Sequence, residues 1–172
     1  MYKLIIYSIA FSVLFSCTSN SKRIEKSEVE NFMFSFFSTR EKLILIASEE
    51  ERAIINQVKE FYAIADSASI LIDNLLSYKR NNENGVAKIF YHESNIISAA
   101  IDNNTFVADN HSAKFNISVV YKQRVNEKNY LTDDDVYSEG RRVYQVKIIQ
   151  QNDGTYKIQS ARLILDPIAN NY

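Results

Sequence analysis

The feature that most constrains the fold is a change of hydrophobic period near Asn104. Before this point, apolar residues recur every three or four positions, as in a helix buried on one face. After it, apolar and polar residues alternate, which is typical of a strand with one buried face. Helices followed by antiparallel strands predict an α+β domain, in which a helical layer covers one face of a curved sheet.

The second half of the chain predicts about four antiparallel strands. Asp153-Gly154 stands between two alternating runs, 141–150 and 155–165, and indicates a tight hairpin. Residues 125–140 are polar and predict a long connection between the first strand and this hairpin. The first strand is predicted from five alternating apolar residues: Ala113, Phe115, Ile117, Val119 and Tyr121.

The first half predicts helices, one of them long. An apolar stripe predicts a helix that starts near Glu28, with Ser27 and Glu30 as a capping box. A heptad-like spacing then predicts one helix over about 48–80, which packs in the core or forms an intermolecular coiled coil. Residues 86–101 fit either a third helix or a strand beginning at 95–101. The heptad positions are Ile54, Val58, Phe61, Ala65, Ala68, Ile72 and Leu75.

Residues 1–16 predict a signal peptide. Lys3 provides a basic start, and the apolar run from Leu4 to Phe15 is shorter than the ~20 residues of a membrane-spanning helix. The chain's one cysteine, Cys17, follows directly. Residues 1–17 also fit an ordinary secretory signal followed by a cysteine without a role in processing, or a short N-terminal anchor.

Leu14-Phe15-Ser16-Cys17 resembles a bacterial lipobox. The resemblance implies cleavage after Ser16, diacylglycerol on Cys17 and attachment of the mature chain to the membrane. It also favours the outer membrane where the cell has one, because Thr18 replaces the aspartate that retains lipoproteins at the inner membrane. Residues 17–27 are then expected to form a polar tether, and 28–172 a single α+β domain.

The order of elements and the final hairpin, 153–158 (DGTYKI), resemble the nuclear-transport-factor-like (NTF2-like) superfamily, also called SnoaL-like or cystatin-like. The resemblance extends over about 28–167, and its specific part is the hairpin. It implies a cone-like fold, in which a bent antiparallel sheet and N-terminal helices enclose a concavity. Some members of this superfamily are small-molecule enzymes.

Composition argues against two classes of function. The formal net charge is −1, whereas nucleic-acid-binding domains usually present a strongly basic face. One cysteine and two histidines make a Cys/His metal site hard to build. We therefore expect no nucleic-acid partner, no metal and no cofactor.

The candidate catalytic residues are few. His92 neighbours Glu93, and His111 lies close to Asp109, so either histidine is a candidate acid or base. Asp109 and His111 lie in a segment that predicts exposed turns, and we assign neither histidine a catalytic role. Asp133-Asp134-Asp135 lacks the pattern of a calcium loop and predicts either an acidic loop tip or the N-cap of a short helix. We expect Arg141 and Arg142 to pair with these acids at the surface.

These patterns predict a lipid-anchored envelope protein whose domain binds a ligand or a partner without catalysis. The membrane, through Cys17, is the one partner that the sequence identifies, and an envelope protein or small ligand remains unnamed. The alternatives are a SnoaL-like enzyme with a histidine in a deep pocket, or an all-helical surface adhesin or host-factor binder.

Overall fold

The structure is a computed structural model that describes residues 23–45, 48–84, 88–128 and 133–165. Its helical part comes first in the chain. The helices are α1 (Lys26–Glu41), α2 (Ser48–Glu60) and α3 (Ser69–Asn84), and two short 3₁₀ helices, η1 (Lys42–Ile44) and η2 (Ala65–Ala68), follow α1 and precede α3.

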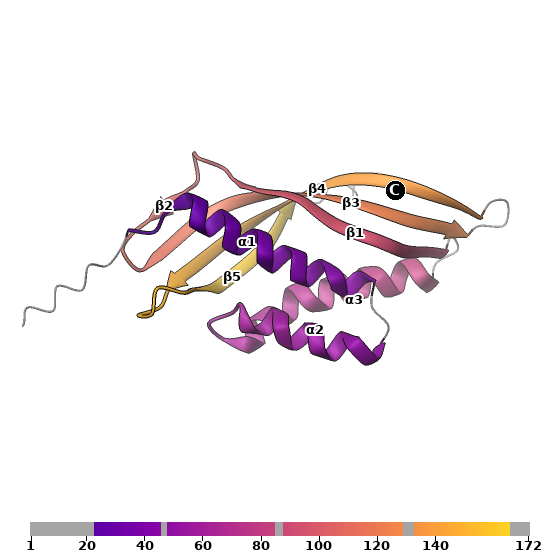
Figure 1. Cartoon of the computed structure of the whole chain (residues 1–172), viewed down its shortest axis with the longest axis horizontal. Helices are drawn as coiled ribbons and strands as arrows, with labels where there is room; N and C mark the ends of the chain where they lie inside the picture. Colours follow the sequence, from indigo (N-terminus) through magenta and orange to yellow (C-terminus); the bar gives the residue numbers. More distant parts are fainter. Residues whose placement is uncertain (1–22, 46–47, 85–87, 129–132, 166–172) are drawn as a thin grey trace, which may run out of the picture.

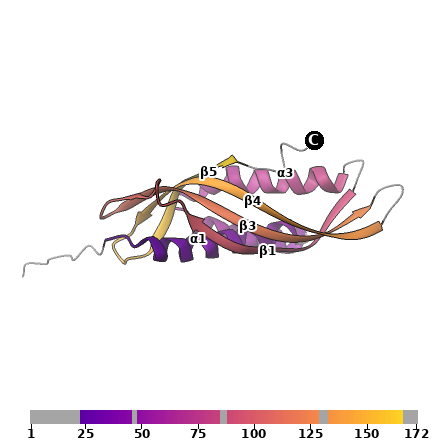
Figure 2. The same ribbon diagram turned by 90° about the horizontal axis from the view of Figure 1, so that it is seen from above.

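An open antiparallel sheet follows. Its strands are β1 (Lys88–Ile101), β2 (Val107–Ala108), β3 (Ser112–Lys128), β4 (Asp133–Gln150) and β5 (Tyr156–Leu165). The spatial order is β1-β3-β4-β5, and the short β2 pairs with one end of β3. Figure 1 shows the long strands curving over the helices, and Figure 2 shows α1 and α3 running along them. The α+β fold class predicted from the sequence is confirmed.

One hydrophobic core joins the helices to the inner face of the sheet. Strands β3 and β4 bury alternate side chains, so the period-two pattern of the sequence corresponds to a real inner face. Helix α1 buries the side chains that recur at helical spacing. The largest fully buried apolar side chains are Tyr121, Tyr144, Phe36, Phe37, Phe115, Met33, Leu43, Ile44, Ile117, Ile148 and Ile158.

The predicted Asp-Gly hairpin is confirmed between β4 and β5. Gly154 has a φ of 84°, a left-handed conformation that glycine adopts without steric cost. Asp153 accepts a 2.9 Å hydrogen bond from the Thr155 amide, which stabilises the turn. Tyr144 and Ile148 share a buried face with Ile158 of the next strand.

The prediction of one long helix over 48–80 is wrong. The chain leaves the helical path after Glu60, and residues 61–63 lie beside β5, where Tyr62 bridges to Ile158. The Ile158 amide donates to the Phe61 carbonyl at 2.7 Å, and the Ala63 amide donates to the Ile158 carbonyl at 2.9 Å. This pairing with the sheet edge replaces intrahelical hydrogen bonds, so α2 and α3 are separate helices. The heptad-like spacing therefore does not form a continuous coiled-coil seam.

Two strand boundaries also differ from the sequence predictions. The ambiguous segment 86–101 contains a strand from Lys88 onward, because it pairs with β3 along its length. The segment 125–140, predicted as a polar connection, consists largely of the ends of β3 and β4, which remain paired. Val136 and Tyr137 of this segment are exposed, so burial imposes no apolar–polar alternation at these two positions. The all-helical alternative is excluded, because 112–128 and 156–165 are strands.

The beginning of α1 also differs from the prediction. The helix begins at Lys26, its N-cap is Glu25, and no side chain caps it. The expected capping box is absent, because Glu30 instead accepts a hydrogen bond from the Ile101 amide at 2.8 Å. Ile24, within the predicted tether, is buried in the core.

The predicted signal peptide, 1–16, and Cys17 lie outside the described residues. In the part of the chain that the structure describes, no helix is both long enough and apolar enough to cross a membrane.

Candidate functional site

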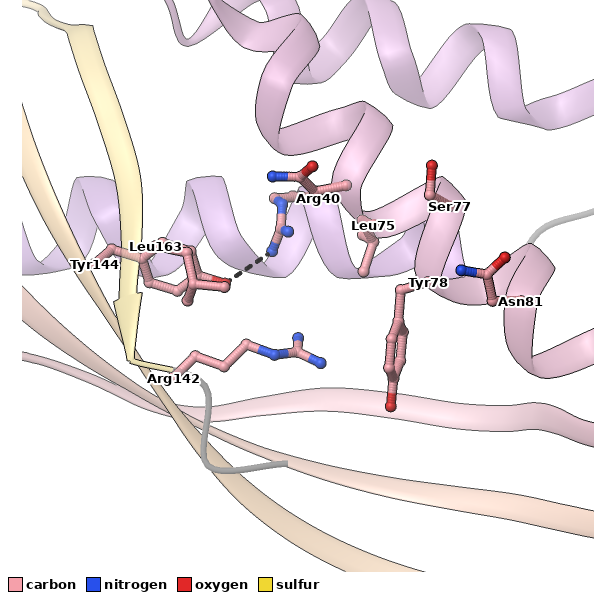
Figure 3. A pocket seen from close by; sticks show the side chains of 9 residues that line it. Arg40, Leu75, Ser77, Tyr78, Asn81, Arg142, Tyr144 and Leu163 are labelled. Carbon is pink, nitrogen blue, oxygen red and sulfur yellow. Dashed lines mark hydrogen bonds between the residues drawn. The ribbon is translucent and has the colours of Figure 1, made fainter. Parts of the chain in front are cut away.

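A pocket of about 340 Å³ opens between the helical layer and the sheet. It lies in a concavity between helices and sheet, as the resemblance to the NTF2-like superfamily implied. Figure 3 shows Arg40 above Arg142, with Leu75, Tyr78 and Asn81 of α3 to the right of both. Its lining comes from α1, α3, β4 and β5: Arg40, Asn74, Leu75, Ser77, Tyr78, Asn81, Arg142, Tyr144 and Leu163.

Arg40 reaches the pocket from the last turn of α1. It follows Met33 and Phe36 at helical spacing, so its position on the buried face of the helix is set by the helical period. Its Nη1 donates to the Tyr144 hydroxyl at 3.2 Å, and its Nη2 donates to the Leu71 carbonyl at 3.3 Å. The residue is only 4% exposed, and its Nε has no hydrogen-bond partner among the described residues.

Arg142 enters from β4 and is 5% exposed. It alternates in phase with Tyr144 and Val146, which places it on the inner face of the sheet. Its Nη1 lies 3.6 Å from Glu41 Oε2, a separation at which the two opposite charges attract strongly in a buried site. The guanidinium also lies 4.3 Å from the ring centre of Tyr121 and 5.8 Å from that of Tyr78. These cation–π contacts hold Arg142 in place.

Glu41 is the acidic centre of a buried polar network behind the pocket. Its Oε1 accepts hydrogen bonds from Ser94 Oγ at 2.8 Å and from Gln123 Nε2 at 3.1 Å. Gln123 also donates to Ser94 Oγ at 3.0 Å. The network connects the end of α1 to β1 and β3, and it orients the carboxylate toward Arg142. A buried hydrogen-bonded network of this kind favours one arrangement of helix and sheet.

The remaining lining combines apolar surface with uncharged polar groups. Leu75, Leu163 and the ring of Tyr78 provide apolar contact, and Asn74, Ser77 and Asn81 of α3 provide hydrogen-bonding groups. The described lining contains no histidine, cysteine, aspartate or glutamate. The arrangement suits binding through apolar contact and positive charge, and none of these lining groups is a usual general base at neutral pH.

Neither histidine singled out from the sequence contributes to the described lining of this pocket. His92 is exposed on β1, where the register with β3 shifts between Tyr91 and Glu93. His111 is exposed in the turn before β3. Asp109 accepts a 2.7 Å hydrogen bond from the backbone amide of His111, so their contact is not a side-chain acid–base pair. Backbone amide bonds of this kind, together with the Ser112 hydroxyl, hold the pKa of Asp109 below its usual value.

The predicted surface cluster of acids and arginines is wrong in part. Asp133-Asp134-Asp135 begin β4 rather than a loop, and their side chains lie outside the description. Arg141 is exposed, whereas Arg142 is buried and pairs with Glu41. Adjacent residues of a strand face opposite sides of the sheet, which separates the two arginines. Among the described residues, no group of three or more His, Cys, Asp or Glu residues is placed to hold a metal ion.

Arg40 and Glu41 were not predicted as site residues, and Arg142 was expected at the surface rather than buried. A signal was nevertheless present. Arg40 and Glu41 continue the helical spacing of Phe36 and Phe37, and Arg142 occupies the inward phase of its strand. A charged residue in the phase of buried apolar residues is a candidate for a buried polar site.

A second depression of about 420 Å³ lies on the sheet, lined by Lys114, Gln145, Val146, Lys147, Ser160 and Arg162. Its cations are exposed, and Lys114 and Lys147 are direct cross-strand neighbours. Water and salt screen such exposed charges. The buried pair of arginines therefore makes the helix–sheet pocket the stronger candidate.

No protein-family model matches the chain, and no curated protein gives a significant match. The structure is similar to that of an NTF2 like protein involved in plasmid conjugation, with a TM-score of 0.47 and 9% sequence identity. That likeness covers 82% of this chain and 49% of the other, so this chain spans about half the length of that protein.

Two further solved structures are similar. The intermembrane space region of the chloroplast protein ARC6 has a TM-score of 0.40 and 10% identity, over 84% of this chain and 99% of that one. A periplasmic fragment of TraM has a TM-score of 0.36 and 9% identity, over 77% of this chain and 95% of that one.

Proposed function

We propose that this protein is a lipid-anchored binding protein of the cell envelope. Its α+β domain takes a small ligand in the pocket between α1, α3, β4 and β5, and it performs no catalysis. Diacylglycerol on Cys17 attaches the chain to the membrane, and the outer membrane is favoured over the inner because Thr18 follows the cysteine.

The composition of the pocket is the observation that supports binding. Its volume of about 340 Å³ lies at the lower end of the range typical of small-molecule sites, about 300–1,000 Å³. Its described lining offers apolar surface, amides, hydroxyls and two guanidinium groups, without a histidine or a carboxylate. A SnoaL-like enzyme was expected to place His92 or His111 in such a pocket, and neither lines it.

A pocket-filling variant tests the binding proposal. Ser77 lies on α3 with an exposed side chain at the pocket, so Ser77→Trp is expected to occupy the space without disturbing the core. Native mass spectrometry of protein purified from its own envelope is expected to detect a bound small molecule that the variant loses. Asn56→Trp, at an exposed position of α2 away from the pocket, is the matched control and should retain it. A molecule retained by Ser77→Trp would contradict the proposal.

The anchor has an independent test. Mass spectrometry of the mature protein is expected to show an acylated Cys17 as the first residue, and Cys17→Ala should accumulate as an uncleaved precursor. Two or three acyl chains give stable attachment, so the wild-type protein should fractionate with membranes even in high salt. A mature chain with a free Cys17 thiol in the soluble fraction would refute lipidation.

A further inference from the structure

We propose that the ligand of this pocket is a small organic anion, and that Arg40 is the residue that recognises its oxyanion group. The inference rests on the proposed function, because it names the class of ligand for the same pocket. A carboxylate, a phosphate monoester and a sulfate share the required chemistry, since each presents oxygens that accept hydrogen bonds from a guanidinium.

The charges around the pocket do not balance. Arg40 and Arg142 are both buried, and the described lining contains no acid. Glu41 pairs with Arg142 and neutralises that charge. None of the described ion pairs involves Arg40, so one positive charge at the pocket wall lacks a counter-charge within the described part of the chain.

Arg40 also retains unused hydrogen-bond donors. A guanidinium carries five N–H groups. Two of them are used, toward Tyr144 and Leu71, which leaves three (five minus two). The Nε–H is buried without a partner among the described residues. Both bonds that do form are to uncharged oxygens, whereas a guanidinium binds a carboxylate or phosphate with stronger, charge-assisted bonds.

The protein supplies only weak compensation for burying this charge. The Arg40 guanidinium lies 5.8 Å from the ring centre of Tyr144, close to the limit for a useful cation–π contact. An arginine does not lose its proton in a protein, so it remains charged although burial is costly. An anion in the pocket provides the counter-charge that the described residues do not, and this is the physical reason to retain an arginine here.

The remaining lining residues indicate what kind of group the ligand carries beside its oxyanion. Tyr78, Leu75 and Leu163 provide an apolar surface that suits an aliphatic or aromatic group. Asn74, Ser77 and Asn81 lie along α3 and suit one or two further polar groups. These features favour an organic anion with an apolar part over inorganic phosphate or sulfate, which would leave that surface unused.

Binding of anionic and neutral compounds of similar size shows how much the ligand's charge contributes to affinity. Phenylpropionate and phenyl phosphate are compared with neutral phenylpropionamide, and inorganic phosphate and sulfate form separate arms. Calorimetric titration of the full protein is expected to show at least one organic anion binding ~10-fold or more tightly than the neutral amide, the effect of one charge-assisted hydrogen bond. The organic anion that binds most tightly indicates which oxyanion group the pocket prefers. Inorganic phosphate and sulfate should bind most weakly.

Arg40→Met tests the role of the arginine. The substitution keeps a long side chain and removes the charge. The variant protein should therefore bind the anion no more tightly than the amide. Without ligand the variant should melt close to the wild-type protein, because the loss of two hydrogen bonds, to Tyr144 and Leu71, is offset by removal of a costly buried charge. The wild-type protein should gain thermal stability from the anion, whereas Arg40→Met should not. Arg52→Met, at an exposed position of α2, makes the same change of net charge and should behave as the wild-type protein.

Three results would overturn the inference. They are equal binding of anion and amide to the wild-type protein, unchanged anion binding by Arg40→Met, and failure of every organic anion to bind. These results are distinct from failure of the proposed function. If the bound molecule is neutral and Ser77→Trp loses it, the proposed binding function stands. The inference that the ligand is an anion recognised by Arg40 is then wrong.

Discussion

Gly140 and Tyr121 show how a single residue is selected by its cross-strand neighbour. They are paired between β3 and β4, and the Tyr121 ring lies directly over the glycine. A Cβ at position 140 would collide with the ring and hydroxyl of Tyr121. The same ring packs against Arg142, so displacing it would disturb the pocket wall.

Gly140→Ala is therefore expected to lower the free energy of unfolding by about 1–3 kcal/mol, the usual cost of overpacking. Urea denaturation measures the change. Ser138→Ala, at an exposed position of the same strand, should change stability by less than about 0.5 kcal/mol. Equal stabilities of the two variants would show that the ring moves aside without cost.

Tyr62 gives the domain a dependence on alkaline pH. Its hydroxyl is buried without a hydrogen-bond partner among the described residues, and burial raises its pKa from 10.0 to about 12, an effect that the charge of nearby Arg40 partly offsets. Above pH 10 the unfolded tyrosine loses its proton while the folded one retains it, so the unfolded state binds fewer protons. The free energy of unfolding then falls between pH 10 and 12.

Urea midpoints measured from pH 9 to 12 should decline more steeply for the wild-type protein than for Tyr62→Phe. The variant also removes an unpaired buried hydroxyl, so at pH 7 it should be no less stable than the wild-type protein. Parallel pH curves would contradict this account of Tyr62.

At the scale of elements, the break between α2 and α3 separates two alanines that look equivalent in the sequence. Ala65 and Ala68 both occupy heptad-like positions in the stretch that was expected to be one helix. In the structure Ala65 is exposed at the start of η2, whereas Ala68 is fully buried. Only the second alanine meets a packed neighbour.

Ala68→Leu should destabilise the domain by about 1–3 kcal/mol, because extra methylenes do not fit a packed core. Ala65→Leu adds the same atoms to an exposed site and should stay within about 0.5 kcal/mol. Thermal melts of the two variants decide between the broken helix and a continuous one, since a continuous heptad helix would make both substitutions similarly costly.

For the whole molecule, the order β1-β3-β4-β5 makes β3 and β4 the central strands. Each has a partner on both sides over part of its length, while β1 and β5 lie at the edges. Native-state amide exchange should therefore be slowest in 113–121 and 142–148, where the strands also have buried side chains.

Residues 136–139 of β4 should exchange faster, because their side chains are exposed. Hydrogen exchange followed by mass spectrometry resolves these segments. Uniform protection along β3 and β4 would show that the projecting end belongs to the same cooperative unit as the core.

The sequence by itself determined the class of fold, the hairpin at Asp153-Gly154 and the inner face of the central strands. Each follows from local rules: the period of apolar residues, and the freedom of glycine to adopt positive φ. The helix break at residues 61–63 and the strand in 88–101 were decided only by pairing with distant strands, which no local pattern encodes.

The candidate site is among the features that only the tertiary structure decided. The helical and strand periods place Arg40 and Arg142 on inward faces, but tertiary structure decides that Glu41 pairs with Arg142, whereas none of the described ion pairs involves Arg40. The physical reason is that burial and electrostatic compensation depend on which elements face each other, whereas sequence periodicity reports only the direction in which each side chain points.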